Sequence, residues 1–125
     1  MHTVKLVKKF HFEAAHRLVN APEGHKCRNL HGHSFKFEIE VKGEVEPKRG
    51  WFMDYKDISR IAKPVVEELD HSYLNDIPGL ENGTSENLAK WIWEKIDKKI
   101  KGLHRISVYE TASSECHYYG KKEQV

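Results

Sequence analysis

The chain has 125 residues, which fits one domain with a modest core rather than two domains. Its 21 basic and 19 acidic side chains leave a formal charge of +2, which is too balanced to indicate binding to nucleic acid or a membrane surface through charge. The sequence has no signal-peptide pattern, no stretch of roughly 20 apolar residues and too few cysteines for a disulfide framework. We therefore expect one cytoplasmic globular domain over residues 1–125, with no nucleic-acid or membrane partner.

Two segments in the first third of the chain alternate like β-strands. Residues 3–12 alternate polar and apolar side chains, and residues 34–42 do so without a break. The second segment places Phe35 and Phe37 on an apolar face and charged residues on the other, so one face of this strand should meet solvent. Residues 20–29 between them are rich in Pro, Gly and Asn, which is typical of a loop.

The middle of the chain changes to helical spacing. Apolar residues over 54–69 fall on one helix face, and Asp54 stands where an N-cap is expected. Residues 71–83 have loop composition. Thr84 can cap a second helix, which Gly102 is expected to end.

Residues 103–110 and 116–119 then indicate two more strands, followed by a frayed tail over residues 121–125. Grouped strands and helices predict an α+β domain, a four-stranded antiparallel sheet with two helices on one face. Such a sheet has two uncovered edges, and exposed edges pair readily with other chains. We therefore expect a homo-oligomer.

Nine histidines are the unusual feature of the composition, and three of them suggest a metal site. His31 and His33 point to the same face if they lie on a strand, and Gly32 between them allows close approach. His16 follows the first strand and reaches the same point if the two strands pair. Three imidazoles with an open position are a catalytic zinc arrangement. The alternative is that these are ordinary surface or capping histidines.

Cys27 lies four residues before His31 and has three interpretations. Its thiolate could be a fourth zinc ligand. It could instead act as a base or nucleophile, since Lys26 and Arg28 favour the thiolate. The third interpretation is a loop cysteine with no role.

Two further positions carry candidate chemistry. Asp70 and His71 could form a base with an orienting partner, although spacing alone favours a histidine that stabilises a helix C-terminus. Glu110 shares the parity of Ile106 and Val108, so it lies on the core face of its strand. A buried carboxylate needs donors, which an aminopyrimidinone edge would supply. The alternative is a solvated glutamate where the strand ends.

Six segments together resemble the 6-pyruvoyl-tetrahydropterin synthase superfamily, over residues 10–120. They are FEAAHRL (12–18), EGHKCRNLHGHSF (23–35), GWFMDY (50–55), LDHSYLND (69–76), NGTSENLAKWIW (82–93) and YET (109–111). The resemblance implies the tunnelling fold, in which three subunits join their sheets into a barrel and two trimers stack into a hexamer.

The resemblance also implies a role for each candidate residue, and it favours catalytic roles where spacing alone did not. The implied zinc ligands are His16, His31 and His33; the implied catalytic residues are Cys27, His71 with its partner Asp70, and Glu110, which also anchors the pterin.

The implied activity is that of a carbon–carbon lyase. It converts 7,8-dihydroneopterin triphosphate to 6-carboxy-5,6,7,8-tetrahydropterin, releasing acetaldehyde and triphosphate, as a step in queuosine biosynthesis. The spacing between Cys27 and His31 resembles the carboxy-forming subgroup. The alternatives are a pyruvoyl-forming enzyme, a folate-pathway relative that cleaves dihydroneopterin, and a non-catalytic zinc-binding module.

Overall fold

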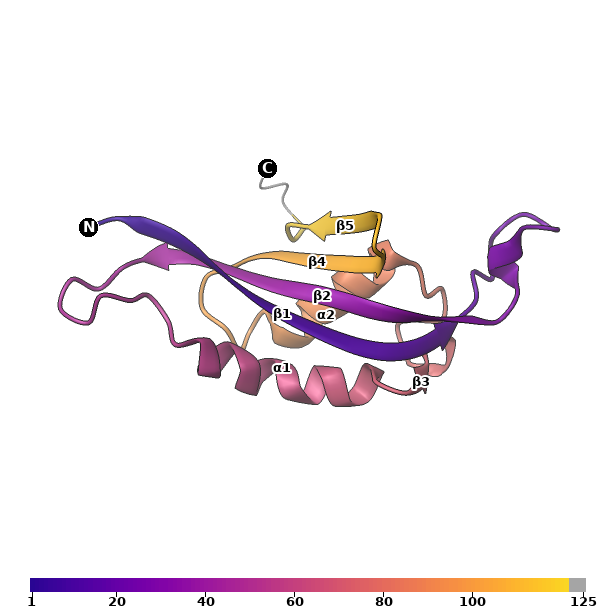
Figure 1. The fold of residues 1–125 in the computed structure, drawn as a ribbon, viewed down its shortest axis with the longest axis horizontal. Coiled ribbons are helices and arrows are strands. Elements are labelled where there is room, and N and C mark those ends of the chain that lie inside the picture. The colour runs from indigo at the N-terminus through magenta and orange to yellow at the C-terminus, as the bar shows by residue number, and fades with distance from the viewer. Residues whose placement is uncertain (122–125) are drawn as a thin grey trace.

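Within residues 1–121, five strands form one sheet in the order β3-β1-β2-β4-β5, and both α-helices of this part pack on the same face of it (Figure 1). The computed structural model describes residues 1–121, so most of the expected tail lies outside the described residues. The elements are β1 (Thr3–His16), η1 (Lys26–Arg28), β2 (His31–Glu44), α1 (Tyr55–Leu69), β3 (Ser72–Tyr73), η2 (Leu74–Asp76), α2 (Ser85–Ile96), β4 (Leu103–Thr111) and β5 (Ser114–Tyr118). The predicted α+β class is confirmed.

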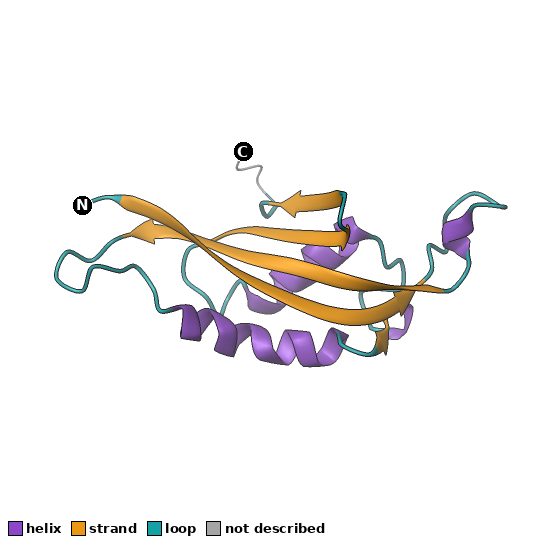
Figure 2. Ribbon diagram, in the orientation of Figure 1, coloured by secondary structure: helices purple, strands orange, loops and turns teal. Residues whose placement is uncertain are grey.

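The longest unit of the fold is the hairpin of β1 and β2, which are 14 residues each (Figure 2). The two strands pair without a register shift, from Thr3 opposite Glu44 to His16 opposite His31. Both strands are longer than predicted, because β1 continues through Ala14 to His16 and β2 already begins at His31, before Phe35. The histidines take the inward-facing positions there.

Both helices begin where the sequence predicted. The side chain of Asp54 accepts a hydrogen bond from the Lys56 N–H at 2.9 Å, and Thr84 accepts one from the Asn87 N–H. Such caps satisfy backbone donors that the first helical turn leaves free. The second helix stops at Ile96, earlier than expected, and a turn leads on to β4.

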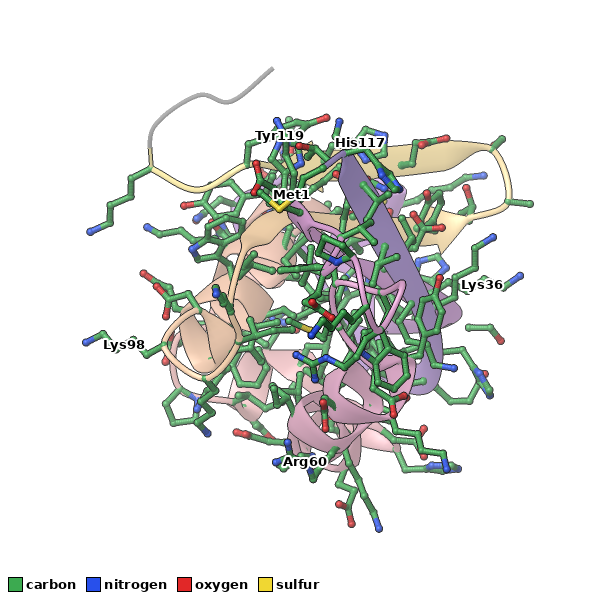
Figure 3. All side chains as sticks on the ribbon, turned by 90° about the vertical axis from the view of Figure 1, so that its left-hand side faces the viewer. Met1, Lys36, Arg60, Lys98, His117 and Tyr119 are labelled. Atoms are coloured by element: carbon green, nitrogen blue, oxygen red, sulfur yellow. The ribbon has the colours of Figure 1, made fainter. Side chains whose placement is uncertain are left out.

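The core lies between the helices and one face of the sheet. Its largest fully buried side chains are Phe12, Phe35, Phe37, Ile39, Ile58, Leu69, Leu74, Leu80, Leu88, Ile92, Ile96 and Ile106. The other sheet face is polar, as predicted: in Figure 3, Lys36 projects away from the helices, whereas Arg60 projects from the helical side. None of the helices within residues 1–121 is long and apolar enough to cross a membrane.

A fifth strand was missed. Ser72 and Tyr73, predicted as loop, pair in parallel with Ala14 and Ala15 at the edge of the sheet. Two residues carry no periodic signal, and their partner lies far away in sequence. This short strand brings the end of α1 beside the end of β1, where His16 lies.

Replacing Gly102 with alanine should destabilise the protein much more than the same change at Gly50. The backbone φ angle is +75° at Gly102 and +79° at Gly50. An L-residue with a side chain adopts such a conformation at a cost of about 1–2 kcal/mol. A Cβ at Gly102 would also lie 2.4 Å from the Lys42 carbonyl oxygen, whereas Gly50 faces open space. Overpacking adds about 1–3 kcal/mol. Urea unfolding of both variants checks this, and equal losses would contradict it.

Candidate active site

Three imidazoles converge at the end of the β1–β2 hairpin. His16 and His31 face each other across the strands, and His33 lies opposite Ala14 on the same face. One ligand nitrogen from each ring lies within 4.8 Å of the other two, so the group could hold a metal ion. The rings of His16 and His33 also pack edge-on against Phe35, at 5.4 Å between centroids. The site is therefore built onto the end of the apolar core.

Backbone carbonyls determine which nitrogen two of the rings present. Nδ1 of His16 lies 2.7 Å from the Gly83 carbonyl oxygen, and Nδ1 of His31 lies 2.7 Å from the Asn29 carbonyl oxygen. A carbonyl can only accept, so each Nδ1 carries the hydrogen and donates it. In a neutral ring, Nε2 then keeps its lone pair for a metal.

The lone pair of His16 Nε2 faces a carboxylate. His16 Nε2 is fully buried and has no hydrogen-bond partner among residues 1–121, yet it lies 3.1 Å from Oε1 of Glu110. Two acceptors this close require positive charge nearby. A proton can supply it: burial opposes protonation, but Glu110 and the Gly83 carbonyl outweigh burial and raise the pKa of His16. A metal cation bound by Nε2 would meet the same need, so the residues fit a metal centre.

Glu110 occupies the inward-facing position that strand parity predicted. Its Oε1 also lies 3.8 Å from Nε2 of His33, and its side chain is 28% exposed. The contact with His16 lowers the pKa of Glu110 although burial opposes this, so the group is a carboxylate at neutral pH. By contrast, burial lowers the pKa of His33 despite the attraction of Glu110. An anionic acceptor thus stands beside the imidazoles, open to a ligand.

Asp70 and His71 form a pair between α1 and β3. Asp70 Oδ2 lies 3.0 Å from Nδ1 of His71, while Oδ1 accepts from the Glu13 N–H at 2.9 Å. Mainly because of that backbone donor, the pKa of Asp70 is lowered. His71 has φ +58°, a conformation that non-glycine residues seldom adopt, and its N–H donates to the Glu13 carbonyl. This turn brings together two neighbouring side chains that would point apart on a strand.

The Asp70–His71 pair ends the first helix and borders a depression that reaches His33. Asp70 is the C-cap of α1, with its N–H donating to the Val66 carbonyl, as spacing alone had suggested for this region. His71 lines a shallow depression that also includes Gly32, His33 and Ser34. The imidazole of His71 is exposed to solvent.

Cys27 lies in the loop between β1 and β2, within η1, and is half-buried. Its N–H donates to Nδ1 of His25 at 3.0 Å, and its carbonyl accepts from the Leu18 N–H. The potential metal-binding group comprises the three imidazoles and does not include its thiol. Figure 1 shows this loop reaching beyond the end of the sheet. The structure therefore leaves the Cys27 sulfur free of the imidazole group.

Three backbone contributors to the candidate site had no signal in the sequence. The carbonyls of Gly83 and Asn29 orient imidazoles, but every residue has a carbonyl, so no residue type marks them. Glu13 likewise acts through its backbone, holding both members of the Asp70–His71 pair.

Comparison with known proteins shows what kind of enzyme carries this site. A family model described as 6-pyruvoyl tetrahydropterin synthase matches residues 5–121. The chain belongs to this family. A solved structure of Caenorhabditis elegans 6-pyruvoyl tetrahydropterin synthase superposes with a TM-score of 0.88 at 27% identity, covering 97% of this chain and 98% of that one. The tunnelling-fold architecture predicted for the subunit is thereby confirmed.

Two relatives within the 6-pyruvoyl tetrahydropterin synthase family have different names. The chain is 41% identical over 123 residues to 6-carboxy-5,6,7,8-tetrahydropterin synthase of Synechocystis, covering 94% of each protein. It is 38% identical over 109 residues to dihydroneopterin monophosphate aldolase of Pyrococcus furiosus, covering 85% of this chain and 89% of the relative. The chain is therefore a pterin-processing enzyme, and the expectation of a family lyase is confirmed.

Proposed function

We propose that the chain is a zinc-dependent lyase that converts 7,8-dihydroneopterin triphosphate to 6-carboxy-5,6,7,8-tetrahydropterin, releasing acetaldehyde and triphosphate. The observation that carries this proposal is the open triad of His16, His31 and His33 with the Glu110 carboxylate beside it. The similarity to the Synechocystis enzyme supports this product over others in the family. The reaction would be a cytoplasmic step of queuosine biosynthesis.

The donor set favours zinc as the metal. Three imidazole nitrogens with no fourth protein ligand are typical of catalytic zinc sites. Zinc bound there would act as a Lewis acid on the hydroxyl oxygens of the substrate side chain. The chain's own part is to orient the ligands, because the Gly83 and Asn29 carbonyls hold two Nδ1–H groups and leave each Nε2 free.

The remaining residues bind the ring and move protons. Glu110 would accept hydrogen bonds from the amino and ring N–H groups of the pterin, and its lowered pKa keeps it anionic for this charge-assisted contact. Cys27 as a thiolate would take the side-chain proton. His71, oriented by Asp70 at 3.0 Å, would exchange protons with solvent or the intermediate.

Mass spectrometry of the products formed from 7,8-dihydroneopterin triphosphate tests this function. We expect 6-carboxytetrahydropterin and equimolar acetaldehyde, both lost when zinc is removed and restored when it is returned. Formation of 6-pyruvoyl-tetrahydropterin, or of a pterin with its side chain cleaved without reduction of the ring, would assign one of the alternative family reactions. A folded, zinc-loaded protein without turnover would indicate a non-catalytic zinc module.

The protein should assemble as a hexamer made of two trimers. The edge strand β3 has only two residues, and β5 pairs with β4 on one side only, so both edges of the sheet have backbone groups available for another chain. Light scattering after size exclusion should give about six times the 14.6 kDa chain mass. A monomer that stays active at nanomolar concentration would refute this assembly and the joining of sheets into a barrel.

A further inference from the structure

The amide of Asn75, in η2, ties together two segments that are distant in sequence. Its Oδ1 accepts from the Arg17 N–H at 3.0 Å. Its Nδ2 donates to the Arg17 carbonyl and to the Glu81 carbonyl, both at 2.9 Å. Both hydrogens and the oxygen of this side chain are therefore engaged by backbone groups.

The two segments that Asn75 joins carry the two partners of one hydrogen bond in the metal site. Arg17 directly follows His16, and Glu81 stands two residues before Gly83, whose carbonyl accepts from Nδ1 of His16. From the other side, the Asn82 carbonyl accepts from Nδ2 of Asn87 in α2 at 2.9 Å. The short segment from Glu81 to Gly83 is thus held at both sides.

We infer that Asn75 is a positioning residue of the metal centre: it holds the Gly83 carbonyl against Nδ1 of His16 and so keeps Nε2 as the ligand atom. A neutral imidazole has two tautomers, and the hydrogen bond at one nitrogen decides which nitrogen carries the lone pair. If the carbonyl drifts, the hydrogen can move to Nε2, which already faces the carboxylate of Glu110 at 3.1 Å. The consequence for metal affinity rests on the metal-binding part of the proposed function.

Two variants of Asn75 and one control variant test the inference. Asn75→Ala removes all three hydrogen bonds. Asn75→Asp keeps the shape and the acceptor for the Arg17 N–H, but it replaces two donors with an anionic oxygen facing two carbonyls. Trp91→Phe removes a different hydrogen bond from the same loop, the one from Nε1 to the Pro78 carbonyl at 3.1 Å, which has no link to His16.

The first measurement is the tautomer of His16 by ¹⁵N NMR, in metal-stripped protein at a pH where the ring is neutral. The parent protein and Trp91→Phe should hold the hydrogen on Nδ1, whereas both Asn75 variants should show a mixture. The second measurement is zinc affinity by competition with a chelator. Loss of groups that orient a ligand weakens metal binding about 10- to 100-fold, and we expect the lower end of that range for both Asn75 variants and no more than about a twofold change for Trp91→Phe.

An unchanged tautomer in both Asn75 variants would overturn the inference, as would equal effects of Asn75→Asp and Trp91→Phe. If Asn75→Ala does not fold, the isosteric Asn75→Asp carries the comparison. A parent protein that binds no zinc would refute the proposed function, while the tautomer comparison would still decide the role of Asn75.

Discussion

Replacing Cys27 with alanine should lower the turnover number by about 100- to 10,000-fold, the usual contribution of a general acid–base group. Zinc content, thermal midpoint and hexamer mass should stay unchanged, because the sulfur does not belong to the imidazole group. The bonds that hold this residue, to His25 and Leu18, come from its backbone and survive the substitution. Substrate binding should change little, since in the proposed function Glu110 and the zinc would hold the pterin.

Cys116→Ala is the matched control for this experiment. Cys116 is the other free cysteine, half-buried in β5, and burial raises the pKa of its thiol. Its removal should leave turnover unchanged. If Cys27→Ala loses zinc and melts at a lower temperature, Cys27 is a structural ligand instead. Normal turnover in Cys27→Ala would remove this residue from the mechanism.

His31→Ala should reduce zinc from about one ion per chain to a small fraction and abolish turnover, because two imidazoles cannot replace a three-ligand site. Among the three ligands, His31 is the better choice for this test than His16, since it is only partly buried whereas His16 is fully buried beside Phe35. Elemental analysis gives the metal content. Full zinc occupancy in His31→Ala would refute the assignment of the ligands.

The same experiment separates a catalytic site from a structural zinc module. His2→Ala removes an exposed histidine and should keep both zinc and activity. Chelation of zinc from the parent protein should leave its circular dichroism nearly unchanged. The cluster of buried apolar side chains that forms the core includes none of the three histidines. Unfolding on chelation would favour the structural module.

Local patterns predicted the parts of the fold that local interactions decide. Alternation around Phe35 and Phe37 identified β2 and its solvated face, and the caps Asp54 and Thr84 identified the helix starts. The strand Ser72–Tyr73 was missed because its pairing with β1 depends on tertiary packing. Tertiary packing also explains why α2 ends at Ile96, earlier than predicted. Ile100 continues the helical spacing of apolar residues, but it is buried from the turn that follows the helix.

The candidate site was predictable to the extent that it depends on strand parity. Spacing placed His31 and His33 on one face. We expected His16 to reach them if the two strands paired, and the structure shows that β1 and β2 do pair, with His16 opposite His31. Spacing alone did not predict the contact between Asp70 and His71, because the positive φ that brings their side chains together is not expected of a histidine. The Gly83 carbonyl and the Asn75 amide that supports it required the tertiary structure.

The pairing of His16 with His31 is the last of the β1–β2 ladder, and this has a consequence for how the enzyme can evolve. Residues 17–30, which carry Cys27, lie wholly outside the ladder. Insertions or deletions there leave the register of the strands intact, whereas a one-residue change within either strand would turn its histidines to the opposite face. Natural variation can therefore remodel the loop that carries Cys27 while the three converging histidines keep their positions.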